Sequence, residues 1–417
     1  MKRFSFFFCS VLLLFFLASC GKPVVKIGYV NPSTGALAGN GEGADWVCEQ
    51  MYAYVQKNPI YIGGKQADFE IIMYDCKSDP KLCREHAERL VKHDKVDVLL
   101  ALQTITMVIP EAAVAEELGI PCVSIQAPTD ALAASRKSFD WTYHAFWTVD
   151  TIYTTYQGLW SASGHPKQSG AKIGFLFPDD PDGKLWSEVF ARRAAEDGYV
   201  VVDPGRYPVG TRDFEQTAAL FKRQQIAVLT GTNVPLDFIA AMDALLKAGV
   251  QVDSITMGRV SATQAATAAL GQTGLNLGSA VWWNKNFGFT SELTGIDCKT
   301  IASQYAKDNF DEPFPQPAAY AYAALELAIH ALKNAGSKNR KKLLDALSRL
   351  DVMTIVGPVC YNKQCGGLHY SETPLAGGQW QLENNELQLK VVDNAAYPTI
   401  PLEGTYKKEN VTTESKN

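Results

Sequence analysis

The chain has 417 residues, of which 20% are charged and 47% hydrophobic, and it carries a formal net charge of −5 at pH 7. This composition is neither that of a disordered chain nor that of a membrane-embedded one, and the length favours two domains over a single core. Because no basic stripe appears along the chain, we expect no nucleic-acid partner.

The amino terminus has the parts of an export signal. Lys2 and Arg3 supply positive charge, residues 4–17 are almost wholly apolar, and Leu-Ala-Ser-Cys follows at residues 17–20. A membrane-spanning helix needs about 20 apolar residues, so this run is too short. The four-residue order resembles the bacterial lipobox, which implies a signal peptide of residues 1–19 and lipid attachment to Cys20. An ordinary signal or an uncleaved anchor is the alternative. No later segment is long and apolar enough to span a bilayer, so we expect a lipid-anchored, otherwise soluble protein.

Residues 24–30 predict the first strand, and turn chemistry stops it directly afterwards. A glycine-rich loop at residues 39–43 then leads into a predicted helix at residues 44–56. This order is the first half of a parallel βαβ unit. Open α/β sheets bind ligands at the carboxyl ends of their strands, so Asn40, within the glycine loop, is a candidate ligand contact.

Strands and helices continue to alternate, at about 25–30 residues per unit, which predicts parallel, doubly wound sheets. The alternation runs through two rounds of similar size, followed by two helices and several strand-like pieces. The predicted strands are 69–75, 96–102, 120–124, 171–177, 199–202, 226–230 and 254–257, with later strand-like pieces at 357–361, 378–382 and 387–392; the predicted helices are 81–93, 109–118, 185–196, 213–223, 237–247, 317–333 and 341–350.

Seven cysteines follow Cys20, and an exported chain permits disulfides. We predict the pairs Cys76–Cys83 and Cys360–Cys365, because each closes a short loop that contains turn residues. An odd number leaves at least one thiol free. Metal binding is the alternative, but no CxxC and no histidine cluster supports it, so we predict no metal.

The motifs of common enzyme classes are absent from the sequence. The glycine loop lacks the GxGxxG register and the GK[ST] ending of nucleotide-binding loops, and no GxSxG indicates a nucleophile elbow. The six histidines are scattered, and the acidic residues 179, 180 and 182 surround a proline in a pattern more typical of a turn than of a metal site. We predict no catalytic residue and no cofactor, which makes an exported α/β enzyme the weakest alternative.

A series of short segments follows the order and spacing of a known family. The segments are Ile27-Gly28-Tyr29-Val30 with Ser33-Thr34-Gly35 and Gly41, Tyr74-Asp75 with Asp79-Pro80, Gly119-Ile120-Pro121 with Ser124, Asp182-Gly183, Thr211-Arg212-Asp213-Phe214, Ala248-Gly249 and residues 320–325. Over about residues 24–400 the chain resembles the type I periplasmic solute-binding lipoproteins of the branched-chain amino acid (leucine/isoleucine/valine) ABC uptake family. No segment is specific alone; their order and spacing carry the resemblance.

The resemblance implies an α/β fold of two doubly wound parallel-sheet lobes joined by a three-stranded hinge. We place the three crossings near residues 143–148, 280–284 and 353–357. This divides the chain into a first lobe of residues 24–145 plus 283–353, a second lobe of residues 146–282 plus 354–402, and a loose tail of residues 403–417.

The family also implies a role and a place in the cell. A small-molecule ligand binds between the lobes, which close on it by hinge motion, and a membrane permease with cytoplasmic ATPase subunits receives the loaded form. We expect a monomer that is lipid-anchored in the bacterial cell envelope, on the extracytoplasmic side. A sensor lipoprotein of the same fold, which signals to a partner protein, is the alternative.

In relatives, the loops after the third and fourth strands hold the ligand's carboxylate by hydroxyls and backbone N–H groups. Here the corresponding loops are residues 102–106 and 126–129, and the second lobe adds loops after its own strands. The residues implied are Gln103, Thr104, Ala127 and Thr129 from the first lobe and Asp182 and Asn233 from the second. Two positions depart from the pattern: Ile105 stands where amino-acid binders carry a serine, and Val260 stands where they carry an acidic residue for the ammonium group. A buried ammonium needs a partner, so this departure disfavours α-amino acids.

Arg259, beside Val260, favours an anionic ligand, since a guanidinium binds a carboxylate in a bidentate way; a surface or salt-bridged arginine is the alternative. Aromatic clusters at the first two crossings suggest cleft walls for a flat or apolar ligand, or else hinge packing. From the clusters Trp141, Tyr143, His144, Phe146, Trp147 and Trp282, Trp283 we take Trp147 and Trp283 as ligand contacts and His144 as a core residue. We therefore prefer a small organic or aromatic carboxylate over a leucine-like amino acid.

Overall fold

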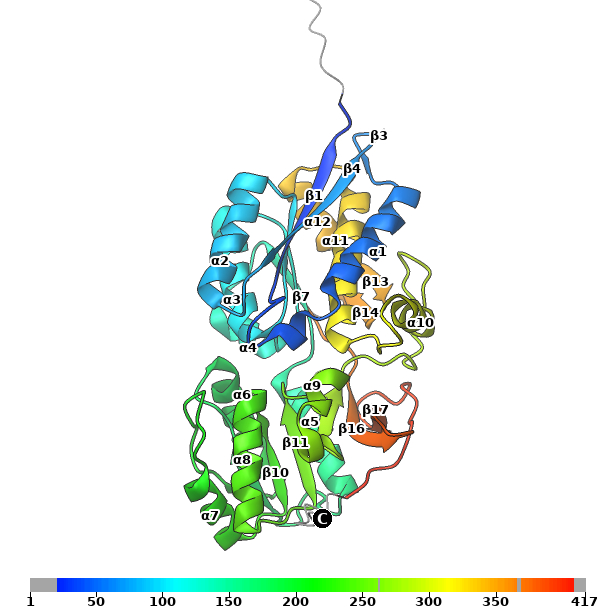
Figure 1. Cartoon of the computed structure of the whole chain (residues 1–417). Coiled ribbons are helices and arrows are strands. Elements are labelled where there is room, and N and C mark those ends of the chain that lie inside the picture. Colours follow the sequence, from blue (N-terminus) through cyan, green and yellow to red (C-terminus); the bar gives the residue numbers. More distant parts are fainter. Residues whose placement is uncertain (1–20, 262, 366–368, 409–417) are drawn as a thin grey trace, which may run out of the picture.

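The computed structural model describes residues 21–408 except Ala262 and residues 366–368. Figure 1 shows two α/β lobes, one above the other, each built around its own sheet. The predicted signal peptide and the lipid site at Cys20 lie outside the described residues. Within the described part, no helix combines the length and hydropathy needed to cross a bilayer.

The first lobe contains a sheet of six strands in the order β15-β7-β6-β5-β1-β4. Every neighbouring pair in it is parallel. Its first five strands in chain order therefore have the spatial order 2-1-3-4-5 of one doubly wound class. The bounds are β1 (Val24–Asn31), β4 (Asp68–Asp75), β5 (Val98–Ala101), β6 (Cys122–Ile125), β7 (Thr142–Ala145) and β15 (Tyr370–Ser371), with a separate hairpin of β2 (Tyr61–Ile62) and β3 (Lys65–Gln66).

The second lobe contains a seven-stranded sheet in the order β17-β16-β12-β11-β10-β8-β9. Its first five strands repeat the 2-1-3-4-5 order, and an antiparallel pair, β16 and β17, extends the far edge. The bounds are β8 (Lys172–Leu176), β9 (Val200–Val202), β10 (Val228–Thr232), β11 (Ser254–Gly258), β12 (Gly278–Val281), β16 (Ala376–Glu383) and β17 (Glu386–Asp393). The two rounds expected from the sequence are thus two sheets of the same basic topology.

Helices cover both faces of each sheet, which explains why the central strands are apolar on both sides. In β1, Val25, Ile27, Tyr29 and Val30 are all fully buried. The α-helices are α1 (Ala44–Lys57), α2 (Pro80–Arg89), α3 (Thr104–Leu118), α4 (Thr129–Ser135), α5 (Val149–Ala162), α6 (Pro181–Glu196), α7 (Glu215–Gln224), α8 (Pro235–Ala248), α9 (Gln264–Ala268), α10 (Cys298–Asp308), α11 (Gln316–Ala335) and α12 (Arg340–Leu347). Shorter helical turns are η1 (Ala38–Gly41), η2 (Leu90–Asp94), η3 (Gly271–Gly274) and η4 (Lys363–Cys365).

The first two crossings between the lobes follow the last strands of the two rounds, β7 (Thr142–Ala145) and β12 (Gly278–Val281). One follows β7, whose partners are in the first sheet, and leads to α5, which packs on the second lobe. The other follows β12 of the second sheet and leads towards α10 and α11, which Figure 1 places in the first lobe. The main core of the first lobe therefore contains α11, a helix that is buried along almost its whole length.

The third crossing is later in the chain than predicted, and the predicted boundary at residue 354 is wrong. The segment expected to cross is instead a hairpin of β13 (Asp351–Thr354) and β14 (Gly357–Cys360). Its turn at Ile355 is held inside the first lobe, because Glu326 of α11 accepts a hydrogen bond from the Ile355 N–H at 3.0 Å. The chain then adds β15 beside β7 and only afterwards enters the second sheet at β16.

The predicted loose tail begins too early. Residues 403–408 are described and lie on the second lobe, held by contacts that a loose tail would lack. Glu403 accepts hydrogen bonds from Asn284 Nδ2 at 3.0 Å and from the Val391 N–H at 2.9 Å, and Tyr406 donates one to Ser254 Oγ at 2.7 Å. The remainder of the predicted tail, residues 409–417, lies outside the described residues.

One of the two predicted cysteine pairs lies close together in the structure. The Cα atoms of Cys360 and Cys365 are 6.1 Å apart, within the range of a disulfide. Cys76 and Cys83 are instead free, buried thiols, contrary to the prediction. The Cys83 Sγ lies 3.0 Å from Glu111 Oε1, and the Cys76 Sγ lies 3.8 Å from Met107 Sδ, both on α3. The two thiols also interact with each other.

Candidate functional site

A cavity of about 60 Å³ lies between the two lobes, at the carboxyl ends of their strands. Its walls come from segments that follow β1, β5, β6 and β7 in the first lobe and β8, β11 and β12 in the second. This position is the place where doubly wound sheets bind ligands. The residues that line it are Asn40, Thr104, Gln126, Pro128, Phe146, Trp147, Ile152, Tyr156, Asp182, Trp186, Gly258, Arg259, Ser261, Ser279, Ala280 and Trp282.

One end of the cavity is charged. Arg259 Nη1 lies 2.9 Å from Asp180 Oδ2 and 3.4 Å from Asp182 Oδ2, and Arg259 Nε donates to Thr232 Oγ1 at 3.1 Å. The arginine follows β11 in a left-handed conformation, at φ +64°. Burial raises the pKa of Asp182 to about 6, although the positive charge of Arg259 opposes this shift; the negative charge of Asp180 adds to it. Arg259 is therefore a salt-bridged arginine, which is the alternative that the sequence left open.

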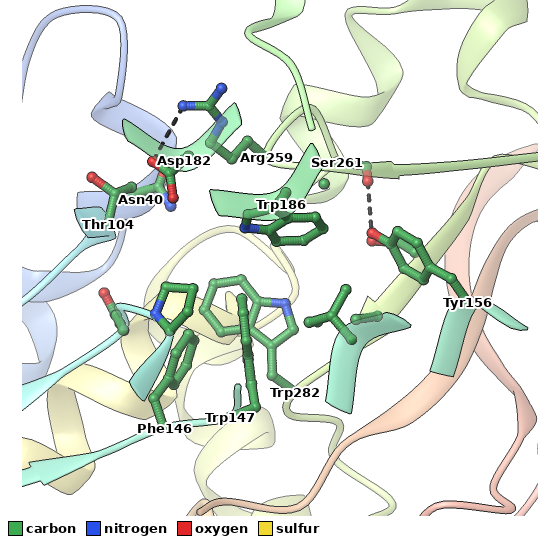
Figure 2. Close-up of a pocket in the computed structure, with 16 residues that line it drawn as sticks. Asn40, Thr104, Phe146, Trp147, Tyr156, Asp182, Trp186, Arg259, Ser261 and Trp282 are labelled. Atoms are coloured by element: carbon green, nitrogen blue, oxygen red, sulfur yellow. Dashed lines mark hydrogen bonds and ion pairs between the residues drawn. The ribbon is translucent and has the colours of Figure 1, made fainter. Parts of the chain in front are cut away.

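The first lobe contributes polar residues next to this ion-pair cluster. Figure 2 shows Asn40 and Thr104 close to Asp182. Thr104 begins α3, five residues earlier than the predicted helix, because Pro110 is tolerated inside the helix. No side chain caps this helix start, so the first N–H groups of α3 have no intrahelical partner. Gln126 follows β6, and its Nε2 donates to the Pro317 carbonyl at 2.6 Å.

Aromatic rings form the middle of the cavity. Phe146 and Trp147, which follow β7, have ring centroids 4.2 Å apart, and the Trp147 ring meets those of Trp186 and Trp282 edge-on at 6.1 Å and 6.4 Å. Figure 2 shows these rings between the charged end and Tyr156. Because one wall comes from the first crossing and Trp186 comes from α6 of the second lobe, the rings meet only when the lobes are close together.

Unsatisfied polar atoms are concentrated around this cavity. Buried polar groups are nearly always hydrogen-bonded, yet five cavity-lining residues have a buried side-chain atom without a partner among the described residues. These atoms are Thr104 Oγ1, Gln126 Oε1, Trp147 Nε1, Trp186 Nε1 and Arg259 Nη2. Thr104, Gln126 and Arg259 are also non-glycine residues at positive φ. Strained backbone and unpaired polar atoms at one place are typical of a ligand site.

Half of the predicted contact residues line the cavity. They are Asn40, Thr104, Trp147, Asp182 and Arg259. Each lies in the first turn or loop after a strand, which is the position that the sequence predicts most directly. Ile105 and Val260, the two departures from the family pattern, pack in the hydrophobic core, and neither is among the residues that line the cavity.

The other predicted contacts support the cavity from behind. Gln103 Nε2 donates to Tyr29 Oη at 2.8 Å and to Asn31 Oδ1 at 2.9 Å, and thereby ties the loop after β5 to β1. Thr129 Oγ1 donates to the Phe146 carbonyl at 2.8 Å. The remaining three are also engaged in the interior: the Ala127 carbonyl faces His144 Nε2 at 2.8 Å, Asn233 Nδ2 donates to the Leu176 carbonyl at 3.0 Å, and Trp283 Nε1 donates to the Ile355 carbonyl at 3.0 Å.

Of the sixteen lining residues, eleven are not among the predicted contacts, and for one tryptophan pair the prediction names the wrong member. Trp282 lines the cavity, whereas Trp283 packs against Phe314 with ring centroids 5.1 Å apart. Ile152, Tyr156, Trp186 and Ser279 had not been singled out. A signal existed for Trp186, which follows Asp182 by one helical turn and so faces the same side of α6. Ile152 and Tyr156 share the same spacing on α5.

Comparisons with known proteins agree with this architecture. The leucine-binding protein LivK of Thermotoga maritima matches with a TM-score of 0.72 and 16% identity, over 89% of this chain and 99% of that one. LivJ of Streptococcus pneumoniae, in complex with isoleucine, gives 0.72 and 18% over the same shares. A Rhodopseudomonas palustris solute-binding protein in complex with 4-hydroxybenzoate gives 0.71 and 17%, over 90% of this chain and 99% of that one. At such identities, these likenesses show the fold.

Among curated proteins none matches the sequence of this chain. The sequence model of one family does match, and it does so over residues 24–381, a range that contains every residue lining the cavity. That range takes in both sheets almost completely. With two doubly wound lobes, three crossings and a cavity between them, the chain belongs to the periplasmic binding protein family.

Proposed function

We propose that this protein captures a small solute with a flat, apolar body and a carboxylate group. The observation that carries the proposal is the set of unpaired atoms in the cavity. Trp147 Nε1, Trp186 Nε1 and Arg259 Nη2 are hydrogen-bond donors, and the Thr104 hydroxyl is a fourth, whereas Gln126 Oε1 is the one acceptor in the set. A cavity rich in free donors is complementary to a ligand rich in acceptors, and a carboxylate offers about four lone-pair sites.

The uncapped start of α3 adds to this preference. The N-terminus of a helix carries partial positive charge, and its free N–H groups point along the axis. Because Thr104 is the first residue of α3 and lines the cavity, its neighbours' N–H groups supply further donors for an anion. The aromatic walls supply surface on which a flat body stacks.

The charged end argues against an α-amino acid. The Asp182 carboxylate lies within 3.4 Å of the Arg259 guanidinium, so it already has a cationic partner in the absence of a ligand. An ammonium group would have to compete with that arginine. The family fold serves both ligand classes: LivJ is in complex with isoleucine, whereas two solute-binding proteins from Rhodopseudomonas palustris are in complex with 4-hydroxybenzoate and benzoate. The donor-rich, aromatic cavity favours the second class here.

The role in the cell follows from the family. We propose that residues 1–19 direct export, that Cys20 carries a lipid anchor, and that a membrane permease with cytoplasmic ATPase subunits accepts the loaded protein. We further propose binding without turnover. His144 lies two residues before Phe146, which lines the cavity, and is buried between Ser124 Oγ and the Ala127 carbonyl; burial lowers its pKa to about 4.

The test is a thermal-unfolding screen of the purified protein with benzoate, benzamide, 4-hydroxybenzoate, leucine, isoleucine and valine. A ligand at 100 times its Kd adds about 2.7 kcal/mol to the free energy of unfolding. Benzoate and benzamide have nearly the same shape, so stabilisation by the aromatic acids but not by benzamide supports a carboxylate site. Stabilisation by the aliphatic amino acids alone would overturn the proposal.

A variant pair sharpens this screen. Thr104→Val keeps the side-chain shape but removes the hydroxyl from the cavity, and we expect about a tenfold loss of affinity for the acid. Thr106→Val is the matched control, because Thr106 lies two residues later in the same helix turn and does not line the cavity. Equal effects of the two substitutions would show that the hydroxyl of Thr104 does not contact the ligand.

A further inference from the structure

The cavity has a second polar end, opposite the ion-pair cluster. Figure 2 shows Tyr156 and Ser261 at the far side of the aromatic rings from Asp182 and Arg259. Together with Ser279 they form a cluster of three hydroxyl groups, which we call the hydroxyl end. They come from three elements of the second lobe, α5, the loop after β11, and β12.

The hydroxyl end is deeply buried. The exposed fraction is 1% for Tyr156, 1% for Ser261 and 6% for Ser279. The serines pair with each other, since Ser261 Oγ donates to Ser279 Oγ at 3.2 Å. This bond commits the hydroxyl hydrogen of Ser261 and leaves that of Ser279 without an acceptor. The Tyr156 hydroxyl makes no hydrogen bond to any described residue, and burial raises its pKa well above the usual value.

Apolar residues surround these hydroxyls on the cavity side. Ile152 lies one helical turn before Tyr156 on α5, Ala280 follows Ser279 on β12, and both line the cavity. In Figure 2 the tryptophan rings lie between Tyr156 and Asp182. Burying a hydroxyl without a partner is unfavourable, and phenylalanine at position 156 and alanine at position 279 would fill the same space with apolar atoms. The hydroxyl groups of Tyr156 and Ser279 each have a hydrogen without an acceptor. Together they are complementary to a hydrogen-bonding group on the ligand.

We infer that the hydroxyl end binds a polar substituent, a hydroxyl or a carbonyl oxygen, at the far end of the ligand's flat body. The inference rests on the proposed function and adds to it that the ligand's carboxylate lies at the charged end, beside the free Nη2 of Arg259. A ligand that spans the cavity then meets donors at both ends and stacks on the tryptophans between them. A site that hydrogen-bonds such a group rejects the analogue that lacks it, because the site's own polar groups are then left unpaired.

The test compares two probes, 4-hydroxybenzoate and benzoate, which differ only in the group opposite the carboxylate. The dissociation constants of both are measured by titration calorimetry on the wild-type protein and on Tyr156→Phe. We expect the wild type to prefer 4-hydroxybenzoate by about tenfold or more, and Tyr156→Phe to bring the ratio of the two constants close to one. Ser279→Ala should lower the ratio as well, by removing the second free hydroxyl.

A control in the same helix separates a local effect from a general one. Tyr153 also lies on α5, but its hydroxyl donates to Asp197 Oδ2 at 3.1 Å, away from the cavity. Tyr153→Phe should therefore keep the wild-type ratio, even if the protein melts at a lower temperature. A reduced ratio in Tyr153→Phe equal to that in Tyr156→Phe would overturn the inference.

The remaining outcomes are distinct. If the wild type binds both acids equally, or prefers benzoate, the hydroxyl end does not read a distal polar group and the inference fails while the proposed function stands. If the wild type binds neither acid, the proposed function fails and the inference falls with it. A preference for 4-hydroxybenzoate that Tyr156→Phe does not change would place the discriminating contact elsewhere and overturn the inference.

Discussion

Arg259 Nη1 lies 3.4 Å from Asp182 Oδ2, and both side chains line the cavity between the lobes. Asp180 is the second carboxylate on this arginine, at 2.9 Å. With both aspartates ionised, the three side chains carry a net charge of −1, and with Asp182 protonated they carry none. The protonation state of Asp182 therefore sets how strongly this end of the cavity repels an anion.

The first prediction concerns pH. The pKa of Asp182 is raised to about 6, chiefly by burial, so the group gains a proton as the pH falls through that value. A carboxylate ligand should bind more tightly at pH 5 than at pH 8, by on the order of tenfold if its charge shifts the pKa of Asp182 by about one further unit. Calorimetric titration of benzoate at both values measures this. Asp182→Asn, which is neutral throughout, should lose the dependence, and tighter binding at pH 8 in the wild type would contradict the prediction.

A second prediction distinguishes a residue that stabilises the fold around the cavity from a residue that contacts the ligand. Gln103→Leu removes two buried hydrogen bonds and leaves the Tyr29 oxygen without its donor, whereas Asn31 Oδ1 still accepts from the Tyr29 hydroxyl. We expect the free energy of unfolding to fall by about 1–3 kcal/mol, measured by urea denaturation. Asn40→Ala is the comparison, because Asn40 is half-buried and lines the cavity. It should weaken benzoate binding and change stability by less than Gln103→Leu; the reverse ranking would contradict the assignment.

Tryptophan fluorescence provides a third check. Trp282 lines the cavity, whereas Trp283 donates its indole hydrogen to the Ile355 carbonyl and packs against Phe314. A bound ligand should therefore change the emission of Trp282 and leave that of Trp283 unaltered. We expect Trp283→Phe to keep the ligand-induced change of the wild type and Trp282→Phe to reduce it. A loss of the change only in Trp283→Phe would restore the contact that the sequence predicts.

The fourth prediction concerns the thiols. In the structure Cys360 and Cys365 form a close pair, for which we expect a disulfide, and five cysteines from residue 21 onward are free: Cys48, Cys76, Cys83, Cys122 and Cys298. Titration of the denatured, unreduced protein with a thiol reagent should find these five; Cys20 does not add to the count if it carries a lipid. In the native protein the four fully buried thiols should react only as fast as the protein opens. A count of three after denaturation, together with a peptide that links residues 76 and 83, would show that the predicted pair forms.

Much of the fold could be predicted from the sequence because parallel strands buried on both faces give largely apolar runs. Residues 24–30 and 96–102 are examples, and β1 and β5 occupy them. The short strand β7 could not be found in this way, since Tyr143 and His144 read as part of an aromatic crossing. The hairpin turn at Ile355 was equally hidden: its position depends on Glu326, which is distant in sequence and meets it only in the folded lobe.

The residues of the site also fall into those that the sequence could predict and those that it could not. Residues directly after a strand, such as Thr104 and Arg259, can be predicted, because the strand end fixes where they lie. Gln103 precedes Thr104 by one residue and takes the opposite role, since a left-handed backbone at both positions turns its amide inward to Tyr29. Sequence spacing alone does not distinguish such neighbours. Tyr156 comes from the middle of a helix, and only the packing of α5 against the second sheet brings it to the cavity.

The late third crossing determines how early each lobe can fold while the chain is being synthesised. The first lobe needs α11, the β13–β14 hairpin and β15, so its sheet and its main core stay incomplete until residue 371 has left the ribosome. The second lobe in turn waits for β16 and β17. Neither half of the polypeptide can reach its native state early, because contacts between residues far apart in sequence form only after the intervening chain exists. A growing chain of this design stays without a complete core for most of its synthesis, which would suit the export that we propose for it.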